Sequence, residues 1–108
     1  MNDNAAQKTG IDTNWTEVVS LRPHEDLSKV LVVFENQDTS NQAKFRLLAK
    51  WSEDGIETSY KKLLEKTLDP SSGPKPVKGN EPAPSEYLVE AKAVSGTVDV
   101  IGLIFSKE

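Results

Sequence analysis

The stretch from Lys29 to Gly55 constrains the fold more than any other part of the chain. It begins with a continuous apolar run at 30–34, passes through a polar segment and ends in an alternating run at 43–51. The apolar side chains of the alternating run share one parity: Ala43, Phe45, Leu47, Ala49 and Trp51. Because successive side chains of a strand point to opposite faces, this parity implies one buried face and one solvated face. The pattern predicts a β-sheet protein and specifies no chemistry.

Composition narrows the class of protein. The chain has 108 residues, enough for one domain with a core of its own. Its net charge of −4 argues against a dedicated nucleic-acid binder and against an anionic membrane surface as the partner. The absence of cysteine excludes disulfides, thiolate metal sites and a cysteine nucleophile. We find neither the apolar core of a secretory signal nor an apolar run of about 20 residues, and we expect a soluble protein made inside the cell.

Further strands are expected at 15–21, 56–60, 87–93 and 98–105, with hairpin turns at Asp54-Gly55 and Ser95-Gly96. Residues 61–68 fit a short helix as well as an irregular strand. The runs 30–34 and 98–105 carry apolar side chains on both parities, so both faces of these strands are expected to be covered. The sequence predicts an all-β protein with a single antiparallel β-sandwich, immunoglobulin-like or jelly-roll in style, and an open barrel as the alternative.

Two segments stand apart from this pattern. Residues 1–14 are polar and are expected to form an extended N-terminal arm, which leaves 15–108 as the sandwich domain. Residues 69–86 hold five of the six prolines and are expected to form a long Pro/Gly-rich loop inserted in that domain. Loops of this length inside a compact domain are usually functional or disordered.

No set of residues predicts catalysis. His24 is the sole histidine and the only candidate for a general base. A nucleophile elbow and a glycine-rich phosphate loop are both missing from the sequence, and the acidic pairs at 25–26 and 53–54 lack the spacing of a calcium loop. We therefore expect a non-enzymatic protein without a cofactor or a metal.

Partner contacts are expected from the arm, the proline-rich loop and a few apolar side chains. Leu103 and Phe105, with Ile101 and Leu48, could belong to a patch that awaits a partner. Trp15 begins a predicted edge strand and is the better candidate for an exposed ring, because Trp51 shares the buried parity. The candidate partner-binding residues are Ile11, Trp15, Leu48, Pro74, Pro76, Val77, Pro82, Leu103 and Phe105.

The strand–loop–strand–turn at 30–55, the polar arm and the terminal strand pair at 87–105 resemble the small all-β decoration, or cement, proteins of tailed-phage capsids. The resemblance implies a structural protein of the virion that binds the outside of a capsid lattice and stabilises it. It implies capsid or other structural subunits as protein partners and a homo-oligomer, with no nucleic acid, membrane or small-molecule substrate. The alternative is a cytoplasmic protein, or a carbohydrate-binding or adhesin-type module that stacks sugars on Trp15, Tyr60 or Tyr87.

Overall fold

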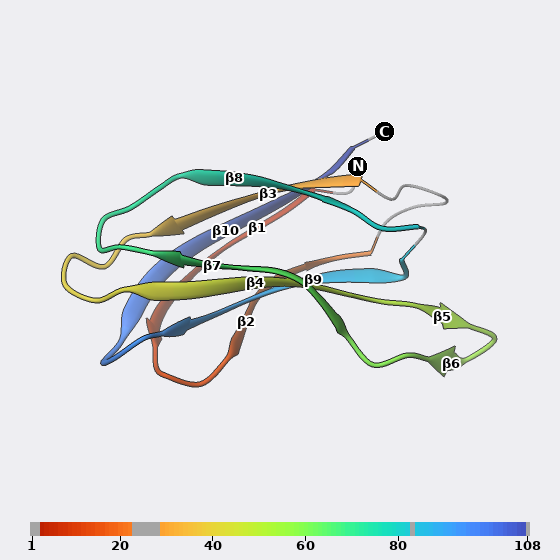
Figure 1. The fold of residues 1–108 in the computed structure, drawn as a ribbon, viewed down its shortest axis with the longest axis horizontal. Helices are drawn as coiled ribbons and strands as arrows, with labels where there is room; N and C mark the ends of the chain where they lie inside the picture. Colours follow the sequence, from red (N-terminus) through yellow and green to blue (C-terminus); the bar gives the residue numbers. More distant parts are fainter. Residues whose placement is uncertain (1–2, 23–28, 83, 108) are drawn as a thin grey trace.

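A computed structural model describes residues 3–22, 29–82 and 84–107, all as strands and their connections. Its strands are β1 (Asp3–Ile11), β2 (Thr16–Leu21), β3 (Lys29–Asn36), β4 (Ala43–Lys50), β5 (Ser52–Glu53), β6 (Ile56–Glu57), β7 (Lys61–Leu68), β8 (Lys75–Asn80), β9 (Glu86–Ala93) and β10 (Val98–Lys107). Eight of them form two antiparallel sheets, and β5 with β6 forms a separate hairpin that projects beyond the sandwich (Figure 1). His24 lies outside the described residues.

The strand order is that of a jelly roll. Sheet A has the order β1-β10-β3-β8 and sheet B the order β2-β9-β4-β7, and the chain changes sheet at every long connection except the one from β4 to β7. This arrangement of eight strands in two sheets confirms the predicted antiparallel sandwich and selects the jelly-roll style. The prediction of a hairpin at Ser95-Gly96 is wrong: β9 and β10 lie in opposite sheets, and this turn crosses between them.

The core lies between the sheets and consists of the inward parity of each strand. Phe34 of sheet A stacks on Phe45 of sheet B with ring centroids 4.7 Å apart, and both rings are fully buried. The predicted buried parity of 43–51 is confirmed: Ala43, Phe45, Leu47 and Ala49 are all fully buried. Trp51 packs partly buried against this core, and its indole Nε1 donates to the carbonyl of Pro82 at 2.7 Å.

The segment expected to form an extended N-terminal arm is part of the sandwich from Asp3 onward. Asp3–Ile11 forms β1, an edge strand of sheet A that pairs along its length with β10. Ile11 is its one bulky apolar side chain and is buried. The strand escapes detection because an edge strand needs no alternating apolar pattern when backbone pairing holds it.

Residues 69–86 also differ from one long loop. Lys75–Asn80 forms β8, the other edge strand of sheet A, paired with β3. Pro76 lies in this strand opposite Val33, and an edge strand tolerates proline because one side of its backbone has no partner. Gly79 lies inward, where a Cβ atom would be 2.9 Å from a methyl of Leu47, so the close approach of the sheets requires glycine.

A β-bulge explains why residues 61–68 fit a helix as well as a strand. Leu47 pairs with Leu64 while Leu48 pairs with Lys62, so Leu63 is an extra residue in β7. Past a bulge the inward parity shifts by one, and adjacent apolar residues then imitate a helical stripe.

The connections at one end of the sandwich are joined by the buried side chain of Asn36. Its Nδ2 donates to the carbonyls of Asn41 at 2.9 Å, Leu68 at 3.2 Å and Asp69 at 3.1 Å. Its Oδ1 accepts from the backbone N–H of Asp38 at 3.0 Å. One side chain thus fixes the β3–β4 connection against the β7–β8 connection.

The parity of β4 makes a direct prediction for stability. Phe45→Ala should lower the free energy of unfolding by about 2 to 5 kcal/mol, because it leaves a cavity between the sheets. Lys44→Ala, one position along on the solvated face, should change it by less than about 0.5 kcal/mol. Urea unfolding followed by circular dichroism measures both, and equal losses would contradict the assignment of the faces.

Asn36→Ala should lower the free energy of unfolding by about 2 to 3 kcal/mol, because it leaves buried carbonyls without a donor. Gln37→Ala, at the exposed neighbouring position, is the matched control and should cost less than about 0.5 kcal/mol. A small loss at both positions in the same unfolding assay would show that water replaces the amide.

Candidate protein-binding face

The outer side of sheet A carries apolar side chains that no described element covers. The central strands β3 and β10 are apolar on both parities, and only their inward parities face sheet B. Their outward, half-buried apolar residues are Leu31, Val33, Ile101, Leu103 and Phe105. Both faces of these strands were expected to be covered. Within the described residues, sheet B covers the inner face and the outer face is bare.

The strand register makes these side chains one continuous surface. Leu103 lies opposite Val33, and Phe105 lies opposite Leu31 on the neighbouring strand. Pro76 of β8 extends the Leu103–Val33 row to the edge of the sheet. We name the six residues Leu31, Val33, Pro76, Ile101, Leu103 and Phe105 the apolar face.

Polar residues border the apolar face. Gln7 and Glu35 flank Ile101 on the two neighbouring strands, and Lys78 lies beside Leu31. An apolar centre with a polar border is typical of a surface that binds another protein, whereas scattered apolar residues need no explanation. The arrangement offers burial of apolar area and a few edge hydrogen bonds, and it holds no group suited to bond making or breaking.

The structure places three of the predicted contact residues together on this face, namely Pro76, Leu103 and Phe105. Pro74 and Pro82 are exposed in the connections on either side of β8. Three others lie elsewhere: Ile11 and Leu48 are buried, and Val77 packs partly buried against the core. Leu48 belongs to the outer side of sheet B, opposite Leu88, so it cannot join Leu103 and Phe105 in one patch.

Leu31 and Val33 were missed as contact residues. The signal was present, because an apolar run without alternation must present side chains to both faces of its strand. Nothing in the sequence alone indicates that β3 is central in a sheet with one bare side. That follows only from the strand order.

Of the three rings considered for sugar stacking, Tyr87 is fully buried and therefore cannot stack on a sugar. Trp15 is half-buried, and the guanidinium carbon of Arg46 lies 4.1 Å from its ring centroid. Tyr60 is 39% exposed, with Lys50 Nζ 5.0 Å from its ring centroid. The three rings do not form a common platform.

The base of the β5–β6 hairpin holds a cluster of titratable groups. Lys50 Nζ lies 3.1 Å from Glu57 and 3.4 Å from Glu86, and the Tyr60 hydroxyl donates to Glu86 at 2.6 Å. The hydrogen bond to Glu57 raises the pKa of Lys50. Burial, reinforced by the hydrogen bond to Glu86, raises the pKa of Tyr60. Lys50 thus joins Glu57 of the hairpin to Glu86 of β9, which fixes the hairpin to sheet B.

Other kinds of site have little support in the described ranges. They contain no group of three acidic, histidine or cysteine side chains placed to hold a metal ion. They also contain no helix with the length and apolar character of a membrane span. A shallow polar hollow of about 280 Å³ lies beside Asn36 and is lined by Glu35, Asn36, Gln37 and Ser71.

The two tyrosines predict how stability depends on alkaline pH. Burial raises the pKa of Tyr87, and Tyr60 is shifted in the same direction, so folding favours both neutral phenols. This contribution is complete below the ordinary pKa of about 10 and is lost as pH rises through the raised values. Phenolate absorbance should therefore appear at higher pH in the native chain than in urea. Tyr60→Phe isolates Tyr87, and coincident native and unfolded titrations of that variant would contradict its burial.

Comparison with known proteins gives a fold and no family. No protein-family model matches the chain, and no curated protein resembles it in sequence. The structure is similar to that of a mitogen derived from Yersinia pseudotuberculosis, with a TM-score of 0.64 at 11% identity, covering 99% of this chain and 87% of that one. It is also similar to YomS, a protein derived from the SPBc2 prophage, with a TM-score of 0.51 at 14% identity, covering 96% and 95%.

A chain from a virus structure is also similar in fold. A chain in the structure of infectious bursal disease virus, Gx strain, aligns with a TM-score of 0.51 at 8% identity, covering 96% of this chain and 32% of that one. At these identities the likeness establishes the sandwich fold alone. The neighbours include a prophage-derived protein and a viral protein, which is loosely consistent with the resemblance to phage structural proteins.

Proposed function

We propose that this protein is a non-enzymatic structural component of a virion, a decoration protein that binds a capsid lattice through the apolar face of sheet A. The observation that carries the proposal is the pair of central strands, β3 and β10, with apolar side chains on a side that no described element covers. A complementary apolar surface on another protein would bury this face.

The composition of the apolar face favours a protein surface over a small ligand. The surface lies on a sheet, and its large side chains come from neighbouring strands in register. Small-molecule sites are concave, whereas extended apolar surfaces with polar borders fit a protein partner of matching shape. Phe105 at one end of the face is an aromatic residue, a type that is enriched in the cores of protein interfaces.

The edges of sheet A support docking face-on over the addition of a further strand. Edge strand β8 contains Pro76, which removes a backbone donor, and it carries Lys75 and Lys78. Proline and lysine on an edge strand hinder pairing with a strand of another chain. Contact through the side chains of the outer side is therefore the favoured route.

Binding to a repetitive lattice suits a surface of this modest size. Many copies bound side by side gain overall affinity from linkage, even when each contact is weak. We expect the protein to be made in the host cytoplasm and to join the virion afterwards. The N-terminal segment contributes indirectly, because β1 completes the sheet that presents the apolar face.

The proposal is tested by asking whether the chain associates with virions of the virus that encodes it. We expect the chain to sediment with purified virions in a sucrose gradient and to be accessible there to added protease. Virions that assemble in cells expressing the chain but contain none of it would contradict the proposal.

Val33→Glu should abolish this association, because it places a carboxylate in the middle of the apolar face. The matched control is Val94→Glu, which makes the same change at a valine that is 44% exposed in the β9–β10 connection. Both variants should keep the far-ultraviolet circular dichroism of the wild type. Equal virion binding by the two variants would exclude the apolar face as the contact.

A further inference from the structure

Between strands β4 and β9, the outer side of sheet B carries one pair of like charges in an otherwise complementary ladder. Strands β4 and β9 place four outward pairs opposite each other, and three of them match in charge or polarity. The matching pairs are Arg46 with Glu90, Leu48 with Leu88, and Lys50 with Glu86. The fourth pair sets Lys44 directly opposite Lys92. We name Lys44 and Lys92 the lysine rung.

The lysine rung costs stability in the isolated chain. Like charges directly opposite each other on neighbouring strands repel, whereas the next pair along, Arg46 with Glu90, closes an ion pair at 2.6 Å. Neither Lys44 nor Lys92 forms an ion pair within the described residues. Departures from local consistency in natural proteins tend to occur where function requires them.

Trp15 gives the lysine rung a defined shape. Its ring centroid lies 4.8 Å from Lys92 Nζ and 4.1 Å from the guanidinium carbon of Arg46. These contacts hold the two cations beside a half-buried indole, so the rung combines positive charge with adjoining apolar surface. A complementary ligand would present carboxylates next to an apolar side chain.

The same chain presents such a group on its projecting hairpin. The β5–β6 turn carries Glu53 and Asp54, both exposed and without an ion pair in the described part of the chain. Ile56 lies just past the turn and is 77% exposed, the most exposed large apolar side chain among the described residues. Asp54 and Gly55 have φ angles of 51° and 80°, as expected for a tight two-residue hairpin turn.

The hairpin is anchored firmly enough to act as a fixed projection. The backbone N–H of Thr58 donates to the carbonyl of Trp51 at 2.8 Å, and the Trp51 N–H donates to Thr58 Oγ1 at 3.0 Å. Lys50 binds Glu57 on the β6 side. A pre-formed hairpin loses little conformational entropy when it binds.

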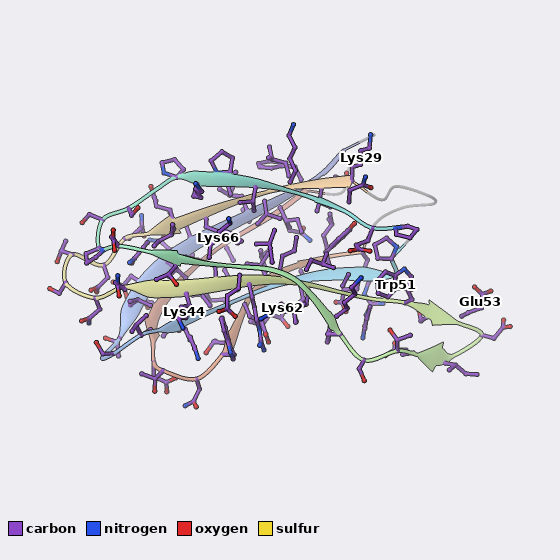
Figure 2. The ribbon with its side chains drawn as sticks, in the orientation of Figure 1. Lys29, Lys44, Trp51, Glu53, Lys62 and Lys66 are labelled. Carbon is purple, nitrogen blue, oxygen red and sulfur yellow. The ribbon has the colours of Figure 1, made fainter. Side chains whose placement is uncertain are left out.

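The two complementary features lie at opposite ends of the molecule. Lys44 is near the start of β4, whereas Glu53 lies beyond its end on the hairpin, and Figure 2 shows them far apart along the long axis. A chain cannot bring its own hairpin to its own lysine rung. The carboxylates that would neutralise the rung must therefore come from another molecule.

We propose that a second copy of this chain fills the lysine rung: Glu53 and Asp54 of one copy bind Lys44 and Lys92 of the next, with Ile56 packed near Trp15. The contact joins different surfaces of the two copies, so it can be made reciprocally in a pair or repeated from copy to copy. It uses sheet B and the hairpin and leaves the apolar face free.

Sedimentation equilibrium of the purified chain tests the proposal in the absence of any particle. The wild type should self-associate in low salt, and the association should weaken as salt rises because exposed charges are screened. Lys44→Glu should weaken self-association roughly tenfold or more, since it sets like charges against the hairpin. A wild-type chain that remains monomeric at all concentrations in low salt would overturn the proposal.

Lys44→Glu has a second readout that separates binding from misfolding. The change gives Lys92 an oppositely charged neighbour across the strands, so the midpoint of urea unfolding should stay equal or rise. Lys66→Glu is the control: it makes the same change in charge on β7, but Lys66 lies opposite the inward Phe45 and so has the other parity from Lys44. This variant should self-associate like the wild type. Loss of association in both variants would indicate a general effect of charge and would overturn the assignment of the rung.

The hairpin is tested with the double variant Glu53→Gln/Asp54→Asn, which removes the charges and keeps a residue that tolerates the turn at position 54. It should be as monomeric as Lys44→Glu. An equal mixture of the two variants should associate, because the first supplies an intact rung and the second an intact hairpin. No association in the mixture would overturn the proposal, whereas Val33→Glu should self-associate normally and so separates this contact from virion binding.

Discussion

The contact between the two sheets is the constraint on which the rest of the structure depends. It is centred on the stacked rings of Phe34 and Phe45, and the inward parity of every long strand packs around them. Because this contact consumes one face of each sheet, the outer sides are free to differ. Sheet A presents apolar side chains on its outer side, and sheet B presents a ladder of charged pairs around Leu48 and Leu88.

This division explains which parts of the fold could be predicted from sequence. Strand β4 alternates strictly because its outer side faces solvent, and its parity identified Phe45 and Leu47 as core. The apolar runs in β3 and β10 indicated strands with two apolar faces, but not that one of those faces is bare. Edge strands β1 and β8 were beyond reach, since backbone pairing holds them and their side chains carry no periodic pattern. The bulge at Leu63 shifts the parity of β7, so its sequence fits a helix as well as a strand.

The candidate site shows the same limit. Leu103 and Phe105 were identified from their own strand, because apolar residues on both parities are visible in sequence. Their neighbours Leu31, Val33 and Pro76 join them only through strand order, which places β3 beside β10, about 70 residues away in the chain, and β8 beside β3, about 40 residues away. Leu48 was grouped with them because the sequence does not show which strands share a sheet. It belongs to the opposite sheet. The pairing of Lys44 with Lys92 likewise becomes visible only in the register.

The two outer sides would respond differently to conditions. Burial of apolar surface is little affected by salt, whereas contacts between exposed charges weaken as ionic strength rises. A protein that binds a lattice with one side and its neighbours with the other could keep the first contact while losing the second. The two proposed contacts lie on different sheets, so a change at one need not alter the other.

Asn36 has a consequence for how this fold tolerates change in length. Its amide joins the β3–β4 connection to the β7–β8 connection, so an added residue in either one would move that connection's carbonyl away from the shared side chain. Either connection can therefore lengthen only at positions that leave the carbonyls bound by Asn36 in place. Within the described residues, Asp54 and Gly55 at the tip of the β5–β6 turn form no hydrogen bond to another loop. This tip is therefore the natural place to insert an epitope or a fluorescent label without disturbing the sandwich.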